Sequence, residues 1–158
     1  MTLTDLCEKL RNWFDVRRHF GTFTIENGTI NLDFLREGQF YRLIGGSYKN
    51  SGVFFYNGEK LEYIKEIYHN NDGSLDIKWD ETGDEKFTGA VWELAIPKNF
   101  IEFYATMCDW QKQNAKVLNS PYQSESFGGY SYSKSSGSNG TLTAWDNFAS
   151  DLARWQKL

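Results

Sequence analysis

The sequence predicts an α+β protein in which a small antiparallel β-sheet or barrel is inserted between the helices of a three-helix core. Three segments have apolar residues three and four positions apart, the spacing of an amphipathic helix: about 2–16, 97–117 and 141–157. Between the first two, residues 21–96 alternate between apolar and polar and are broken by Asn-Gly and Gly-rich turns, which is typical of short strands. The length of 158 residues favours a single domain, 1–158.

The first predicted helix begins with a capping signal. Thr2 is the expected cap, and Asp5 is placed to reach back to it. The apolar face of this helix comprises Leu3, Leu6, Cys7, Leu10, Trp13 and Phe14. Arg17 and Arg18 would follow at its end, where positive charge complements the helix dipole. This arginine pair has two interpretations. It is either a solvated helix end or a contact with a partner or nucleic acid.

The inserted segment contains several hairpin signals. Asn27-Gly28 divides a predicted hairpin over Gly21–Phe34, because both turn residues tolerate positive φ. Asn57-Gly58 is a second signal of this kind, and Gly45-Gly46-Ser47 is expected to be a turn or bulge between strands. The further predicted strands are Gly38–Ile44, Gly52–Tyr56, Leu61–His69, Ser74–Asp80 and Thr88–Ile96.

The two later helices carry broad apolar faces. Pro97 is a favourable first helical residue. The helix after it has one apolar stripe, which is more typical of a buried core face than of a cofactor site. The stripe comprises Phe100, Phe103, Tyr104, Met107, Cys108 and Trp110. Thr143 and Asp146 form a second candidate capping box. The last helix has a narrow seam that either packs on the other helices or docks on a partner: Trp145, Phe148, Leu152 and Trp155.

The charge and composition limit the functional classes. The net charge is −4, which argues against a general binder of nucleic acid or anionic membranes. Residues 59–86 hold nine acids and four bases, and we expect them to form a solvated face. No apolar run approaches the roughly 20 residues that span a bilayer, and the opening residues do not predict a signal peptide. Aromatic residues make up 17% of the chain, and we expect some of them at an interface.

The sequence offers little catalytic chemistry. Cys7 and Cys108 fall on apolar helical faces and are predicted to be free, buried thiols, which fits a reducing compartment. The histidines are His19 and His69, and neither accompanies a nucleophile motif or the closely spaced ligands of a zinc site. We therefore predict no enzyme activity, no cofactor and no metal site.

An arm, about 118–140, separates the last two predicted helices. Within it, Tyr130 to Ser133 alternate aromatic and hydroxyl side chains, the period of a strand, and Gly128-Gly129 permits a bend. Such a segment suits strand addition to another chain. The alternative is a loop folded back onto its own domain.

The arm also carries a family resemblance. It resembles a Ser-Glu-Ser-apolar-Gly-x-Tyr-Ser run of head–tail connector (adaptor) proteins from long-tailed bacteriophages and prophages, in the residues Ser124, Glu125, Ser126, Phe127, Gly128, Gly129, Tyr130, Ser131, Tyr132 and Ser133. The opening to about Leu43 is similar to small prophage proteins encoded among head and tail genes, through Gly21–Ile25, Asn31–Leu35 and Glu37–Gln39. The middle, about Tyr56 to Lys86, has no counterpart in this resemblance.

The resemblance implies a structural role and assigns partner binding to Ser124–Ser133. It implies a homo-oligomeric ring of about twelve subunits between the portal protein and a tail-side stopper or tail completion protein. Viral DNA would pass through the ring without specific binding, and the protein would be located in the virion after assembly in the host cytoplasm. The alternatives are another virion or tail component, or an aromatic-rich β binding module for carbohydrate or peptide that uses rings such as Tyr41, Tyr56 or Trp92.

Overall fold

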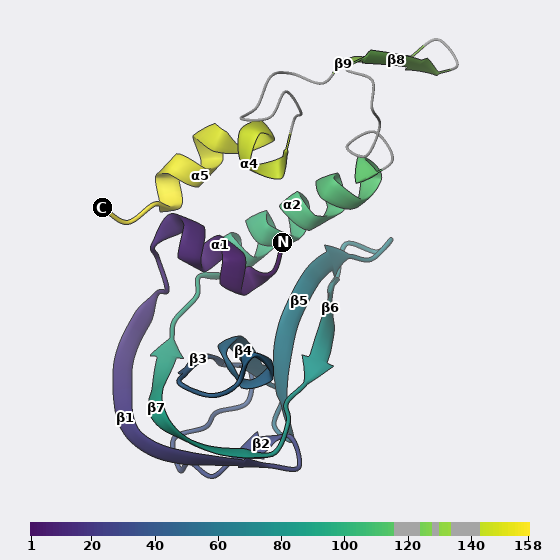
Figure 1. The fold of residues 1–158 in the computed structure, drawn as a ribbon. Coiled ribbons are helices and arrows are strands. Elements are labelled where there is room, and N and C mark those ends of the chain that lie inside the picture. The colour runs from purple at the N-terminus through teal and green to yellow at the C-terminus, as the bar shows by residue number, and fades with distance from the viewer. Residues whose placement is uncertain (116–123, 128–129, 134–142) are drawn as a thin grey trace.

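The computed structural model describes residues 1–115, 124–127, 130–133 and 143–158 (Figure 1). Its main element is a curled antiparallel sheet with the strand order β2-β1-β7-β3-β4-β5-β6. The strands are β1 (Asp15–Glu26), β2 (Thr29–Ile30), β3 (Phe40–Ile44), β4 (Gly52–Tyr56), β5 (Leu61–His69), β6 (Leu75–Glu81) and β7 (Glu85–Leu94). The predicted antiparallel insertion is therefore confirmed as an open, curled sheet.

The helices gather at one end of this sheet (Figure 1). They are α1 (Leu3–Leu10), α2 (Lys98–Gln113), α4 (Ala144–Asn147) and α5 (Ala149–Trp155), and a short 3-10 helix, η1 (Tyr48–Asn50), precedes β4. All seven strands of the sheet lie between α1 and α2 in the sequence, as predicted. None of the described helices is long and apolar enough to cross a membrane.

Two apolar cores use the two faces of the sheet. The inner face of the curl holds Phe23, Ile25, Ile30, Tyr41, Leu43, Phe54, Leu61, Phe87 and Val91. The other face supplies Val53, Ile64, Ile67 and Leu94, which pack against the helices. This arrangement follows from strand alternation, because successive side chains point to opposite faces. The apolar stripe predicted for α2 faces the second core through Phe100, Tyr104, Met107 and Cys108.

Helix α1 ends earlier than the sequence predicted. The prediction of helix over 2–16 is wrong beyond Leu10, because Arg11 takes a left-handed conformation at φ 53° and β1 begins at Asp15. The Leu10 carbonyl accepts from the Lys157 amide at 3.0 Å, and the Asn12 side chain donates to the Trp155 carbonyl at 2.8 Å. The C-terminal segment thus provides hydrogen-bond partners for a backbone carbonyl and a side-chain amide at the point where the chain leaves the helix.

The predicted third helix is divided, so the described residues contain four α-helices rather than the predicted three. The helix is interrupted at Phe148, which has φ −107° and ψ 20° and separates α4 from α5. The seam residues predicted for a single helix still pack on the helical core: Leu152 is buried, and Trp145, Phe148 and Trp155 are partly buried against it. Two short helices therefore bury the seam that was predicted for one.

Two other boundaries also differ. Pro97 is the cap before α2 and has extended backbone angles, so it is not the first helical residue. The predicted hairpin strand to Phe34 stops at Ile30. Beyond it, the Tyr41 hydroxyl accepts from the Arg36 amide at 2.8 Å and lies 3.2 Å from the Phe34 carbonyl, which can accept from it. The buried tyrosine therefore holds this stretch as a loop.

Several local predictions are confirmed. Thr2 with Asp5, and Thr143 with Asp146, form complete capping boxes. Asn27 and Gly28 both have positive φ, 53° and 81°, as the predicted turn requires. The thiols of both cysteines are free and buried, and burial raises the pKa of Cys7 to about 12.

The long pairing of β1 with β7 contains two opposed glycines, Gly21 and Gly89. They have unequal surroundings. A Cβ at Gly89 would overlap the Ile44 carbonyl group, with its carbon at 2.9 Å, and would lie 3.0 Å from the Cα of Gly45. A Cβ at Gly21 would meet nothing closer than the Phe23 ring at 4.0 Å. Of these two opposed glycines, Gly89 is therefore the one that the close approach of β3 to β7 requires.

We predict that Gly89→Ala lowers the free energy of unfolding by more than about 3 kcal/mol, because backbone rather than a flexible side chain must move. Gly21→Ala, directly opposite, should change it by less than about 0.5 kcal/mol. Urea unfolding of the two variants and the wild type measures both values. Equal losses for the two substitutions would contradict the close packing of β3 on β7.

Candidate functional site

The residues predicted to bind a partner lie in a separate two-stranded sheet. Ser124–Phe127 form β8 and Tyr130–Ser133 form β9, and the two strands pair only with each other among the described strands (Figure 1). Gly128 and Gly129, predicted to form a bend, lie outside the described residues. Tyr130–Ser133 is therefore a strand, as its alternating sequence predicted. This strand already pairs with β8 of its own chain.

The register of this hairpin divides its residues into two sets. Glu125 is opposite Tyr132, and Phe127 is opposite Tyr130. Paired residues share a face, and strands alternate faces. By backbone register, residues 125, 127, 130 and 132 therefore fall on one face of the hairpin, and residues 124, 126, 131 and 133 fall on the other. In the sequence the first set contains Phe127, Tyr130 and Tyr132 and the second contains only serines, a pattern typical of a sheet that is covered on one side.

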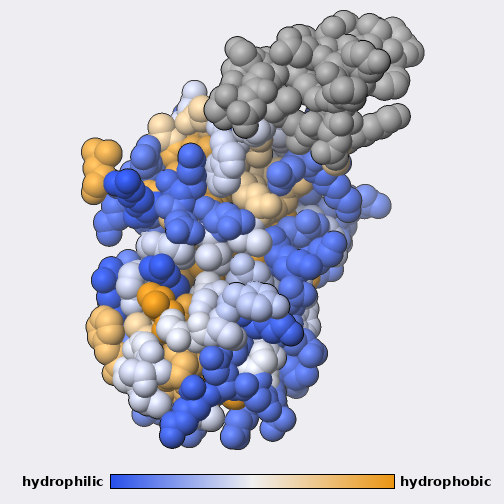
Figure 2. All heavy atoms as spheres, in the orientation of Figure 1, coloured by the Kyte–Doolittle hydropathy of each residue, from blue (hydrophilic) through white to orange (hydrophobic). Residues whose placement is uncertain are grey.

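The outer edge of β1 is the second notable surface. On the side away from β7, β1 pairs with β2 through Ile25 and Glu26, and no other described strand pairs with Asp15–Thr24. Along this edge Val16 and Phe20 are 66% and 75% exposed. Hydrophobic side chains are visible at the surface in Figure 2, on the side where Figure 1 draws β1. A long edge strand with exposed apolar residues is a template for pairing with another strand.

The opposite edge of the same sheet is different. Strand β6 presents the exposed charged residues Asp76, Lys78, Asp80 and Glu81. Charged residues on an edge oppose pairing with another chain. The edge of β1 also carries the exposed residues Arg17 and Arg18, so the two edges differ in the exposed apolar residues Val16 and Phe20, which favour β1 for strand addition.

A ladder of arginine and tryptophan side chains braces the sheet beside this edge. The Arg18 guanidinium lies 3.8 Å from the Trp92 ring centroid, and Arg42 lies 4.4 Å from Trp92 and 3.5 Å from Trp13. Arg18, Trp92 and Arg42 are cross-strand neighbours on β1, β7 and β3. Such contacts contribute about 0.5–2 kcal/mol each. Arg18, interpreted from sequence as part of a helix end, instead fixes β1 to the centre of the sheet.

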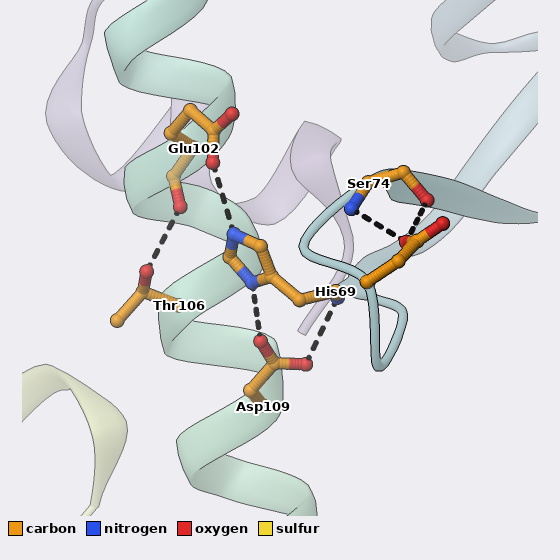
Figure 3. Close-up of polar contacts among 6 residues, drawn as sticks. His69, Ser74, Glu102, Thr106 and Asp109 are labelled. Carbon is orange, nitrogen blue, oxygen red and sulfur yellow. Dashed lines mark hydrogen bonds and ion pairs between the residues drawn. The ribbon is translucent and has the colours of Figure 1, made fainter.

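A cluster around His69 joins the end of β5 to α2 (Figure 3). The His69 Nδ1 atom lies 2.5 Å from Asp109 Oδ2, and Nε2 lies 2.9 Å from Glu102 Oε2. Carboxylates only accept hydrogen bonds, so both contacts are satisfied together by the doubly protonated ring. The hydrogen bonds to Asp109 and then to Glu102 raise the pKa of His69. This cluster was not predicted from the sequence, although Glu102 and Asp109 are seven residues apart and share a helix face.

The geometry of this cluster favours a structural clamp over acid–base chemistry. Both ring nitrogens of His69 are engaged, and the Thr106 hydroxyl donates to the Glu102 carbonyl at 3.0 Å rather than facing the ring (Figure 3). Within the described residues, no group of three or more His, Cys, Asp or Glu side chains has the arrangement of a metal site.

We predict that the His69 clamp stabilises the fold at acidic to neutral pH and weakens as the solution becomes alkaline. The folded pKa is raised above the unfolded value of about 6.5. The stabilisation is therefore fully present below the unfolded pKa and is lost as pH rises through the folded pKa. The melting temperature of the wild type should exceed that of His69→Gln at about pH 6, and the gap should narrow by about pH 9. A gap that stays constant over this range would contradict the clamp.

The comparisons with known proteins add no assignment to this geometry. No protein-family model matches the chain, and no curated protein or solved structure matches it either.

Proposed function

We propose that the protein is a structural subunit of a bacteriophage or prophage virion, a head–tail connector (adaptor) that assembles as a ring between the portal and the tail. The proposal begins from the resemblance of Ser124–Ser133 and of the opening residues to connector proteins. The structural observation that carries it is the unpaired, apolar edge of β1. A subunit that must bind its neighbours needs such an edge, whereas a monomer is expected to protect it.

The aromatic residues give the alternative, a carbohydrate or peptide binding module, less support. The Tyr41 side chain is fully buried. Trp92 lies beneath the guanidinium groups of Arg18 and Arg42, and the Tyr56 hydroxyl donates to the Gly58 carbonyl at 3.0 Å. All six tryptophans are half-buried. Tyr41, Tyr56 and Trp92 therefore do not form an open row of rings on which a sugar could stack.

The charge distribution agrees with a channel subunit. The chain has a net charge of −4, and the charges of β6 face solvent. Phosphates are repelled by acidic surfaces, so DNA can pass without being retained. The partners that this role requires are further copies of the chain, the portal protein, and a tail-side stopper or tail completion protein. The protein would assemble in the host bacterial cytoplasm and stay in the virion.

We predict that deleting the gene from the phage or prophage that encodes it leaves DNA-filled heads and separate tails. Without a connector, the portal has no surface on which a tail can dock. Electron microscopy of lysates, with and without the gene supplied in trans, measures the joining of heads and tails. Purified particles should also contain the protein by mass spectrometry. Normal tailed particles from the deletion strain, or complete particles without the protein, would contradict the proposed function.

A further inference from the structure

We propose that the unpaired edge of β1 accepts strand β9 from a second copy of this chain, so that the β8–β9 hairpin of one subunit extends the seven-stranded sheet of the next. This inference rests on the proposed function, because it names the contact by which the ring would close. The donor and the acceptor are different surfaces of one chain. Each subunit therefore gives one strand and receives one, the heterologous arrangement from which rings are built.

The acceptor edge has the length and surface that strand addition needs. Asp15–Phe23 is without a partner on its outer side among the described strands, and the Thr24 carbonyl beyond it accepts from the Asn31 amide at 3.3 Å. Strand addition binds through main-chain hydrogen bonds along such an edge. The face of β1 that carries Arg18 and Phe20 continues onto β7 through Trp92 and Ala90, their register partners. Because the Arg–Trp ladder and the β7 pairing hold β1 in place, an incoming strand meets an ordered template.

The donor hairpin matches this edge in its pattern and charge. By register, residues 125, 127, 130 and 132 fall on one face of the hairpin, and this face would continue the face of β1 that exposes Phe20 at 75%. Glu125 is the sole charged residue of Ser124–Ser133, and its register partner is Tyr132. Arg17 and Arg18 lie on the acceptor edge with side chains 72% and 47% exposed, and each is in an ion pair within its own subunit, with Glu93 at 3.8 Å and with Asp15 at 2.9 Å. The donor and the acceptor therefore match in strand period and in low net charge, so no like-charge repulsion opposes their pairing.

The covalent connections allow the hairpin to reach a neighbouring molecule. Eight residues, 116–123, separate the described end of the α2 segment from β8, and nine, 134–142, separate β9 from Thr143. Fully extended, these connections could span at most about 29 Å and 32 Å. Both spans are several times the roughly 5 Å distance between paired strands. The hairpin can therefore reach the β1 edge of a second copy that packs next to its own subunit.

The first experiment changes the acceptor edge. Phe20→Lys adds a charge at an exposed position where lysine opposes edge pairing. Tyr48→Lys is the matched control, because Tyr48 is 85% exposed and lies on η1, away from the edge. By light scattering after size exclusion, wild type and Tyr48→Lys should be oligomers, and Phe20→Lys should have the mass of a monomer. A cooperative thermal transition and the same far-ultraviolet circular dichroism spectrum for each protein would establish that all three fold, whereas their melting temperatures can differ because assembly adds stability.

The second experiment identifies the occupant by oxidation of mixed cysteine variants. One preparation carries Thr22→Cys and the other Tyr132→Cys, and the native thiols are buried. Thr22 is two residues from Phe20 and shares its face of β1, the face that residues 130 and 132 would continue. A disulfide between the two preparations can form only between separate chains. We expect the mixture to give a covalent dimer, and neither preparation alone to give it in comparable yield. Moving the second cysteine to Tyr130 allows for the unknown register, and Ser131→Cys, on the other face by register, is the control that should not cross-link.

Three results would overturn the inference: a wild-type protein that stays monomeric at millimolar concentration, a Phe20→Lys protein that assembles normally, or an oligomer that forms no disulfide between chains at any scanned position. A chain carrying both cysteines that closes an internal disulfide, while the mixture forms no dimer, would instead place the hairpin on its own β1. These failures are separate from failure of the proposed function, which is decided by the presence of the protein in virions and by the joining of heads to tails.

Discussion

The pairing of β1 with β7 is the constraint on which the other parts of this structure depend. The first and last strands of the β-segment are joined by ten register pairs, from Asp15–Leu94 to Ile25–Glu85. The pairing brings the end of α1 close to the start of α2, where the Phe14 and Phe100 rings pack with centroids 4.7 Å apart. Because β7 also pairs with β3, the same contact places the N-terminal strand at the edge of the sheet and determines which side of β1 lacks a partner.

The helical layer depends on this pairing as well. Where the chain leaves α1 at Arg11, the Leu10 carbonyl has no partner within the helix. The Lys157 amide donates to it, the Asn12 side chain donates to the Trp155 carbonyl, and the Trp155 ring packs edge-on against Phe100 at 5.0 Å between centroids. The two ends of the chain are therefore joined in one apolar cluster, and the sheet and the helices support each other.

Local signals in the sequence predicted the elements that local chemistry decides. The two capping boxes, the Asn27-Gly28 turn and the limits of β4 and β5 all agree with the structure. The errors arose where distant contacts prevail. Trp13 and Phe14 continue the spacing of α1, but pairing with β7 converts the following residues to strand. Phe148 fits the apolar seam of one continuous helix. The helix is nevertheless interrupted at this residue, and the two shorter helices still bury the seam. Neither outcome can be read from neighbouring residues alone.

The candidate surfaces were predictable to different degrees. The strand period of Tyr130–Ser133 was visible in the sequence, but the pairing of β8 with β9, which creates an aromatic face, required the structure. Only the tertiary fold reveals the exposed edge of β1, because its residues resemble a helix end. The His69 clamp shows an intermediate case, since the spacing of Glu102 and Asp109 indicates one helix face but not the strand end that meets it.

Hydrogen–deuterium exchange of the β1 amides tests the central claim, that this edge is covered on assembly, most directly. The exchange rates of Asp15–Thr24 would be compared between dilute, dissociated protein and concentrated, assembled protein, with β6 as the internal reference. The account predicts slower exchange in β1 and unchanged exchange in Leu75–Glu81 upon assembly. Unchanged exchange in Asp15–Thr24 of the assembled protein would contradict it.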